Sequence, residues 1–237
     1  MKRQNFNGFT LAEVLITLGI IGVVAAMTIP TLLSKIQKSQ IESLLKENYA
    51  NIAQTMRIAQ NDDVEISLWD DNAKKKWFEA YIAPYMKVEQ ICDNKEGCWH
   101  KHTIAKTLDQ KNLYWESVGN TGMTQIGNGF TFKTAKGAYY SLDMFGWDLA
   151  WSIFGIQTRE RTLMFYFDVN GAGKPNIVGK DIYVIVFEPN RGLLPAGYDK
   201  SKEEIENNCL NGDGYWCLAY VKSNNWKIDD RTWKRKK

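Results

Sequence analysis

The sequence predicts an α+β protein, in which one long N-terminal α-helix packs on a globular head that contains an antiparallel β-sheet. Three observations lead to this prediction. An apolar stretch lies near the N-terminus, a helical repeat of apolar residues follows it, and short aromatic and β-branched segments follow from residue 130 onward. One helix followed by a run of adjacent strands is typical of α+β folds.

The composition sets limits on the function. The chain has 237 residues, of which 44% are hydrophobic and 24% charged, as expected for one ordered globular domain with a real core. The net charge is only +3, and part of it lies at the ends, in Lys2 and Arg3 and in the terminal WKRKK. We therefore expect no specific nucleic-acid partner and a solvated C-terminal tail.

The apolar stretch from Phe9 to Ile29 contains 21 residues and a single charge, Glu13. At about 1.5 Å rise per residue, a helix of this length spans the hydrocarbon layer of a bilayer. Lys2 and Arg3 precede the stretch, so the positive-inside rule places the N-terminus in the cytoplasm and the rest outside it.

Glu13 separates three interpretations of this stretch. A conventional signal peptide has a shorter apolar core than this one, although residues 24–26 (VAA) resemble its cleavage site. A plain membrane anchor leaves Glu13 unexplained, because a carboxylate in hydrocarbon costs about 2.5–3.5 kcal/mol. In the third interpretation the chain is cut between Gly8 and Phe9, and the new amine of a neighbouring Phe9 pairs with Glu13 as helices bundle.

The segment GFTLAEVLITLGIIGVVAAMTIP, residues 8–30, resembles the N-terminus of type IV pilins and type II secretion pseudopilins. The resemblance implies an eight-residue leader (1–8), cleaved by a prepilin peptidase between Gly8 and Phe9, and N-methylation of Phe9. It also implies assembly through Glu13 with other pilin or pseudopilin subunits at an inner-membrane assembly platform. The protein would first reside in the lipid of the bacterial inner membrane, and later in a periplasmic or cell-surface fibre.

The helical pattern continues beyond the membrane segment (9–30). Apolar residues recur at steps of three and four through residues 31–62, which predicts an amphipathic continuation that Pro30 kinks but does not end. The members of this stripe are Ile41, Leu44, Leu45, Ile52, Met56 and Ala59. Residues 63–237 then form the head, which begins with a short helix over 73–86 that ends near Pro84. This arrangement is also the pilin-like fold that the resemblance implies.

Five segments of the head are short, aromatic and β-branched and are separated by glycine-containing breaks, as in strands of a sheet. They are FTFK, GAYYSL, WSIFGI, TLMFYFDV and IYVIVF, at 130–133, 137–142, 151–156, 162–169 and 182–187. The stretch from Cys209 to Ile228 predicts a turn that runs into a further strand. Trp216 and Trp226 in it are either core or edge aromatics, or ligand-binding residues.

Four cysteines form two close pairs, Cys92 with Cys98 and Cys209 with Cys217. An even number at short separation, behind an export-like N-terminus, favours two local disulfides over a metal site. Neither pair has the two-residue gap of zinc knuckles.

The most site-like stretch of the head is DVNGAGKPNIVGKD, from Asp168 to Asp181. Asp168, Asn170, Asn176 and Asp181 offer oxygen ligands for calcium, the one cofactor that the sequence indicates. An EF-hand is excluded because Gly179 stands where its loop has Glu. The alternative is a hairpin connection, in which Asn170-Gly171 forms the turn and the Asp and Asn side chains cap the backbone.

No catalytic constellation is recognisable, and we expect a protein that is not an enzyme. The two histidines, His100 and His102, favour a solvated loop over a metal site, and phosphate loops, nucleophile elbows and HExxH motifs are missing from the sequence. The sequence thus predicts a fibre subunit, processed at Gly8–Phe9. The alternative is a membrane-anchored extracytoplasmic module whose head binds calcium or another ligand at residues 168–181.

Overall fold

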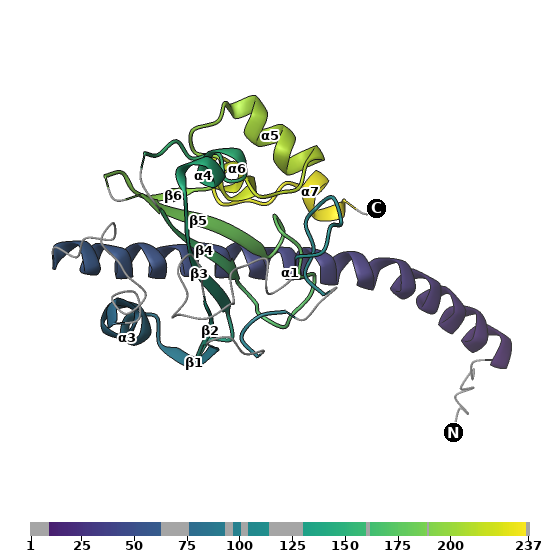
Figure 1. Cartoon of the computed structure of the whole chain (residues 1–237). Helices are drawn as coiled ribbons and strands as arrows, with labels where there is room; N and C mark the ends of the chain where they lie inside the picture. The colour runs from purple at the N-terminus through teal and green to yellow at the C-terminus, as the bar shows by residue number, and fades with distance from the viewer. Residues whose placement is uncertain are drawn as a thin grey trace, which may run out of the picture. The chain divides into compact units, whose positions relative to one another are not determined.

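The computed structural model describes residues 10–62, 76–92, 97–100, 104–113, 130–159, 162–188 and 190–235. Its contacts divide the chain into two units, Met1–Gln40 and Ile41–Lys237. Helices and strands follow in the order α1 (Leu11–Asn61), η2 (Phe78–Ile82), α3 (Ala83–Tyr85), β1 (Val88–Cys92), β2 (Phe130–Thr134), β3 (Tyr139–Phe145), α4 (Trp147–Ser152), β4 (Thr162–Asp168), β5 (Ile182–Glu188), β6 (Gly192–Pro195), α5 (Lys202–Asn211), α6 (Cys217–Ser223) and α7 (Asp230–Lys234) (Figure 1).

The long helix predicted from the sequence is present as α1, and it continues through Pro30. Within the head unit its buried residues recur at helical steps: Ile41, Glu42, Leu45, Asn48, Ile52, Thr55, Met56 and Ala59. This repeat confirms the amphipathic segment and places its apolar stripe in the core of the head. The compact head unit therefore begins at Ile41 and includes the last turns of α1.

The sheet has six strands in the order β1-β2-β3-β4-β5-β6, and every neighbouring pair is antiparallel. Two adjacent interior strands, β4 and β5, are buried along their whole length. Their sequences are apolar at nearly every position because both faces of the sheet are covered. The α+β fold with an antiparallel sheet is thus the fold that the sequence predicts.

Alternate residues of β4 and β5 pack into two separate hydrophobic cores. Phe165 and Phe167 of β4 join Ile185 of β5 in the larger core, which also contains the buried residues of α1. Met164 and Tyr166 point to the opposite face, where a smaller core contains Phe154 and Ile156. This alternation follows the two-residue period of a strand, and it fixes the register of the sheet.

Four details differ from the sequence-based expectations. Residues 151–156, expected as a strand, form the end of α4 and a turn, and residues 209–228, expected as a turn and a strand, form the end of α5 and helix α6. Strands β1 and β6 were not predicted. The helix expected over 73–86 is seen from residue 76, with a π-helical turn (η2) before α3.

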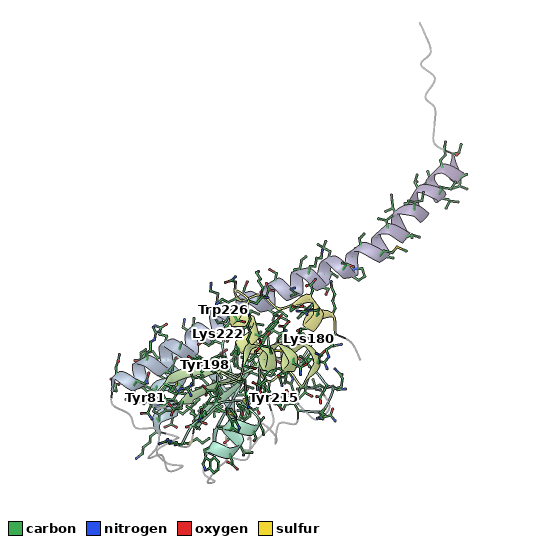
Figure 2. The ribbon with its side chains drawn as sticks, turned by 90° about the horizontal axis from the view of Figure 1, so that it is seen from above. Tyr81, Lys180, Tyr198, Tyr215, Lys222 and Trp226 are labelled. Atoms are coloured by element: carbon green, nitrogen blue, oxygen red, sulfur yellow. A yellow bond between two sulfur atoms is a disulfide. The ribbon has the colours of Figure 1, made fainter. Side chains whose placement is uncertain are left out.

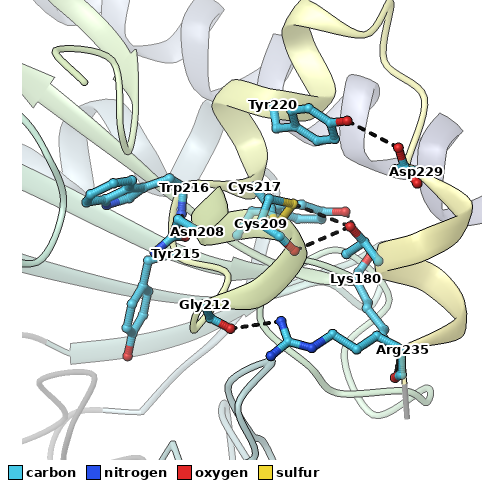
Figure 3. The surroundings of a disulfide bond; sticks show 12 residues. Lys180, Asn208, Cys209, Gly212, Tyr215, Trp216, Cys217, Tyr220, Asp229 and Arg235 are labelled. Atoms are coloured by element: carbon cyan, nitrogen blue, oxygen red, sulfur yellow. Dashed lines mark hydrogen bonds between the residues drawn. A yellow bond between two sulfur atoms is a disulfide. The ribbon is translucent and has the colours of Figure 1, made fainter. Parts of the chain in front are cut away.

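The three C-terminal helices α5, α6 and α7 lie together (Figure 1). The Cys209–Cys217 disulfide joins α5 to α6, and Arg231 of α7 forms an ion pair with Glu206 of α5. Ser201 caps α5 in a capping box with Glu204, and Asp229 caps α7 through Arg231. In Figure 3 the guanidinium of Arg235 points at the carbonyl of Gly212, to which it donates a hydrogen bond of 2.9 Å. Arg235 is therefore docked on the head, against the expectation of a fully solvated tail.

The C-terminal segment is also attached to the buried part of α1. The Glu42 carboxylate accepts the backbone N–H of Ile228 at 3.0 Å and the ammonium of Lys227 at 2.7 Å. The Tyr49 ring contacts the Trp226 ring edge-on at 5.1 Å, and Lys222 lies over both rings. Lys222 and Trp226 lie beside the helix in Figure 2. Trp226 thus acts as a packing residue, the commoner of its two expected roles.

Candidate functional site

The first turn of α1 contains the residue that the sequence singled out, Glu13. Its Oε2 accepts the backbone N–H of Thr10 at 2.8 Å and the Thr10 hydroxyl, also at 2.8 Å. The Thr10 Oγ1 in turn accepts the backbone N–H of Glu13 at 3.3 Å. The two side chains satisfy N–H groups that the start of a helix leaves unpaired. Together they form a capping box.

The Thr10–Glu13 capping box was not predicted from the sequence, although the signal for it was present. The spacing Thr-x-x-Glu directly before an apolar run is the sequence signature of a capping box. Both Thr10 bonds end on Oε2, and Oε1 accepts no hydrogen bond from the residues that the structure describes. Gly8 and Phe9, the predicted cleavage and methylation residues, lie outside the described residues.

The helix around and beyond Glu13 exposes apolar side chains on every side. Leu11 is 79% exposed, and Ile16, Ile20, Ile21 and Met27 are more than half exposed. The hydroxyls of Thr17 and Thr28 donate to carbonyls of the same helix, so that these polar groups are satisfied internally. Within the described chain one helix is long and apolar enough to span a membrane, and its apolar window is unburied.

That exposure separates two explanations of the apolar segment. A buried core helix of a soluble protein passes the same length and composition test, but its apolar residues would be covered. Here a continuous apolar surface is uncovered, and water disfavours it strongly. The segment fits a single-pass membrane anchor.

The second predicted site, residues 168–181, is a loop between β4 and β5 with inward-facing carboxylates. Asp168 Oδ2 lies 2.8 Å from Nε2 of His100, and its Oδ1 accepts the backbone N–H of Asn170 at 3.1 Å. Asp181 accepts two backbone N–H groups, from Asn176 and Ile177, both at 2.7 Å. The carboxylates thus order the turn, as the hairpin interpretation expects.

The amide oxygens of Asn170 and Asn176 behave differently. Both are buried and lack a hydrogen-bond partner among the described residues. A buried oxygen without a partner is costly, and such atoms commonly bind a water molecule or an ion. Two carboxylates and two unpaired amide oxygens are the donor set that calcium prefers. The described residues do not, however, gather three His, Cys, Asp or Glu side chains around one point.

Burial dominates the electrostatics of this loop. It raises the pKa of the Asp168 carboxyl well above its usual range, and it does the same for Asp181, whose pKa is raised further by the nearby Asp168. Burial lowers the pKa of His100. Burial thus opposes charge on both side chains of the His100–Asp168 hydrogen bond. His102, the other histidine of the predicted pair, lies outside the described residues.

Both disulfides expected from the cysteine pairs are present. Cys92 is bonded to Cys98, and Cys209 is bonded to Cys217. The second bond joins α5 to α6 inside the larger core (Figure 3). Beside it, the indole N–H of Trp216 donates to the carbonyl of Ile153 at 2.9 Å, so Trp216 has a structural contact. Both disulfides thus lie in the head, one at the end of β1 and one between α5 and α6.

Comparison with known proteins bears on the N-terminal segment. No curated protein and no solved structure matches the chain significantly. Residues 3–29 match the family described as the prokaryotic N-terminal methylation motif. This range contains Gly8, Phe9, Thr10 and Glu13 and most of the exposed apolar helix. The chain therefore carries at its N-terminus the prepilin-type signal of type IV pilins and pseudopilins.

Proposed function

We propose that this protein is a structural subunit of a type IV pilus-like or type II secretion fibre, made as a precursor. A prepilin peptidase cuts it between Gly8 and Phe9 and methylates Phe9, and the mature helix then joins other subunits. The observation that carries the proposal is an exposed apolar helix that begins with a Thr10–Glu13 capping box inside the methylation motif.

The capping box supports a two-stage use of Glu13. Before assembly, Oε2 is bound by Thr10 within the same helix, which lowers the cost of holding a carboxylate near lipid. Since both of those bonds end on one oxygen, Oε1 is available to a second donor. In the fibre this donor is the N-terminal amine of a neighbouring Phe9, and the charge pair sets the axial register between subunits.

The exposed apolar surface supports the route into the fibre. In the membrane this surface faces lipid, and in the fibre it faces the same surface of neighbouring helices. Because lipid tails and packed apolar helices are similar environments, extraction costs little transfer free energy. Lys2 and Arg3 place the N-terminus in the cytoplasm and the head outside it. In this proposal the chain is the substrate of an enzyme and performs no chemistry itself.

Analysis of the mature N-terminus tests the proposal. Membrane protein from cells that contain a prepilin peptidase is digested, and its N-terminal peptide is identified by mass spectrometry. We expect a start at Phe9 with one added methyl group. An intact Met1 in the presence of an active peptidase, or a start near Met27, would contradict the proposal.

A second candidate function, ligand binding by a membrane-anchored head, is favoured by the unpaired amide oxygens of Asn170 and Asn176. Calcium would be held by these oxygens with Asp168 and Asp181, and it would offset the repulsion between the two buried carboxylates. The residues fit the ion chemically, although each carboxylate is also bound to backbone N–H groups.

Thermal unfolding of the full chain in lipid nanodiscs, with calcium or with magnesium, tests this second candidate. Calcium binding to the folded state raises the midpoint, by the linkage between binding and stability. Asn170→Ala should abolish the calcium-dependent shift, whereas Asn211→Ala on α5 should keep it. An equal midpoint with and without calcium would leave residues 168–181 as a turn only.

A further inference from the structure

An exposed cleft beside α4 belongs neither to the membrane segment nor to the loop 168–181. It has a volume of about 480 Å³ and is lined by Trp147, Asp148, Trp151, Gln157 and Thr158. Pockets for small ligands commonly have volumes of about 300–1,000 Å³. The cleft is therefore large enough for one or two sugar-sized units.

Two tryptophans dominate the cleft, and both are unusually exposed. Trp147 is 64% exposed and Trp151 is 44% exposed, whereas Ala150 is the single fully buried residue of α4. The two tryptophans are four residues apart, so they lie on the same side of the helix. Exposed aromatic surface of this size is unfavourable in water and marks a binding surface.

Trp151 is held in position from one side. The ammonium of Lys200 lies 3.4 Å from the centre of its ring and 5.4 Å from that of Trp216. Trp216 is itself fixed by its hydrogen bond to the carbonyl of Ile153. The cation–π contact thus orients the Trp151 indole before any ligand arrives.

Gln157, a polar residue that lines the cleft, is also held in position by hydrogen bonds. The backbone N–H of Gln157 donates to Asp199 at 2.7 Å, and its carbonyl accepts from Arg191 at 3.0 Å. Arg191 and Asp199 form a two-bond ion pair with each other. The Gln157 backbone is therefore rigid at the cleft. The Asp148 carboxylate also lines the cleft, and within the described chain it makes no hydrogen bond or ion pair, so it is available to a ligand.

We propose that this cleft binds a neutral saccharide, with the flat C–H face of a pyranose ring stacked on the indoles of Trp147 and Trp151. The Asp148 carboxylate and the side-chain amide of Gln157 then bond the ring hydroxyls. The Thr158 hydroxyl, which donates to Glu188 at 3.5 Å, accepts from another ring hydroxyl. Charge argues against other ligands of similar size. The Lys200 ammonium on Trp151 disfavours a cation, and the Asp148 carboxylate disfavours an anion. The ligand that remains has apolar faces, a hydroxylated edge and no charge.

Saturation-transfer NMR on the full chain in lipid nanodiscs tests the proposal, with chitotetraose and cellotetraose as probes and empty nanodiscs as the blank. We expect transfer to the ring protons of at least one of the two sugars. Trp147→Ala and Trp151→Ala should each weaken binding by about tenfold, the loss expected for one stacking partner. The matched control is Tyr85→Ala, which removes an aromatic side chain of 52% exposure from α3 and should leave binding unchanged.

Three outcomes would overturn the proposal. The first is no transfer to either sugar, and the second is equal sugar binding by the tryptophan variants and the parent. The third is that the tryptophans mediate contact between copies of the chain. In the last case, Trp147→Ala would abolish self-association of the protein in sedimentation experiments without any sugar binding by the parent. The surface would then be a contact between copies of the chain. None of these outcomes bears on cleavage at Gly8–Phe9, so the saccharide proposal and the fibre proposal fail independently.

Discussion

Thr10 and Glu13 cap the long helix reciprocally: the Glu13 carboxylate accepts the N–H and O–H of Thr10, and the Thr10 hydroxyl accepts the N–H of Glu13. The bonds involve a single carboxylate oxygen of Glu13. Glu13 therefore has two separable properties, its hydrogen bonds within the chain and its negative charge. Capping requires only the first, whereas pairing with a neighbouring amine requires the second.

Substitution at these two positions distinguishes the properties. Glu13→Gln retains an oxygen acceptor and removes the charge, so we expect membrane insertion and cleavage to proceed while fibre assembly falls strongly. We expect the same result for Glu13→Ala. Thr10→Ala weakens the cap by about 0.5–2 kcal/mol but keeps the charge, and it should assemble better than either variant. The measurement is the fraction of protein in sheared fibres against the fraction in membranes. Normal assembly of Glu13→Gln would rule out the charge pair.

Substitution of Gly8 should block processing. A β-branched side chain at this position, as in Gly8→Val, places bulk next to the proposed cleavage bond, and the precursor should accumulate with its leader attached. The mass of the intact membrane protein measures the result. Asn7→Ala alters the neighbouring leader residue and should be cleaved normally. If Gly8→Val were processed like the parent, the cleavage position would have to be elsewhere.

Two glycines of the head form a matched pair for a stability test. Gly171 and Gly137 both have positive φ, of 57° and 86°. A Cβ on Gly171 would lie 2.0 Å from the carbonyl oxygen of Gly137, whereas a Cβ on Gly137 has open space around it. Gly137→Ala should therefore lower the free energy of unfolding by about 1–2 kcal/mol through backbone strain alone.

Gly171→Ala adds a clash between backbone atoms to this strain, and we expect a loss of about 3 kcal/mol or more. Urea unfolding of the full chain in nanodiscs, followed by circular dichroism, gives both values. Equal losses for the two variants would show that the loop before Asp181 moves away from Gly137 at little cost.

Asp229 gives a pH-dependent prediction. Its side-chain hydrogen bonds from Arg231, together with the backbone N–H of Arg231, lower its pKa from 3.8 to about 2. Between pH 3.8 and pH 2 the folded protein thus binds fewer protons than the unfolded protein. The stabilisation from the ionised Asp229 carboxylate is therefore present above pH 3.8 and is lost as the pH falls toward 2. Because Arg231 is exposed, we expect a loss of about 1 kcal/mol.

The control for this prediction is Asp229→Asn. Asparagine caps a helix as well as aspartate does, but it has no carboxyl to titrate. The difference in unfolding free energy between parent and variant should therefore shrink as the pH falls from 4 to 2. A constant difference across this range would show that the Arg231 contact contributes no net stability.

The sequence predicts most of the fold because its strongest signals are local. The apolar helix, its amphipathic continuation and strands β4 and β5 each follow from the pattern of residues within one segment. The strand expected at 151–156 was wrong for a related reason: its tryptophan, isoleucine and phenylalanine favour strands, yet Trp151 lies on the exposed side of a helix. For the C-terminal helices, the Ser201–Glu204 capping box at the start of α5 was the local signal that went unused.

Long-range contacts could not be predicted. His100 and Asp168 are 68 residues apart, and nothing near either residue indicates the other. The candidate loop 168–181 was located from its own composition. The inward direction of its carboxylates depends on the backbone turn and on His100, which only the folded chain brings together. The cleft at α4 was missed because it requires that segment to be a helix.

The clasp between Glu42 and the segment Lys227–Ile228 has a mechanical consequence. In the fibre that we propose, a subunit held by its N-terminal helix would bear tension along that helix. At Glu42 the load divides, because the carboxylate bonds join the helix directly to a segment that lies 185 residues further along the chain. Part of the tension then passes from the helix to the C-terminal segment without first crossing the six-stranded sheet.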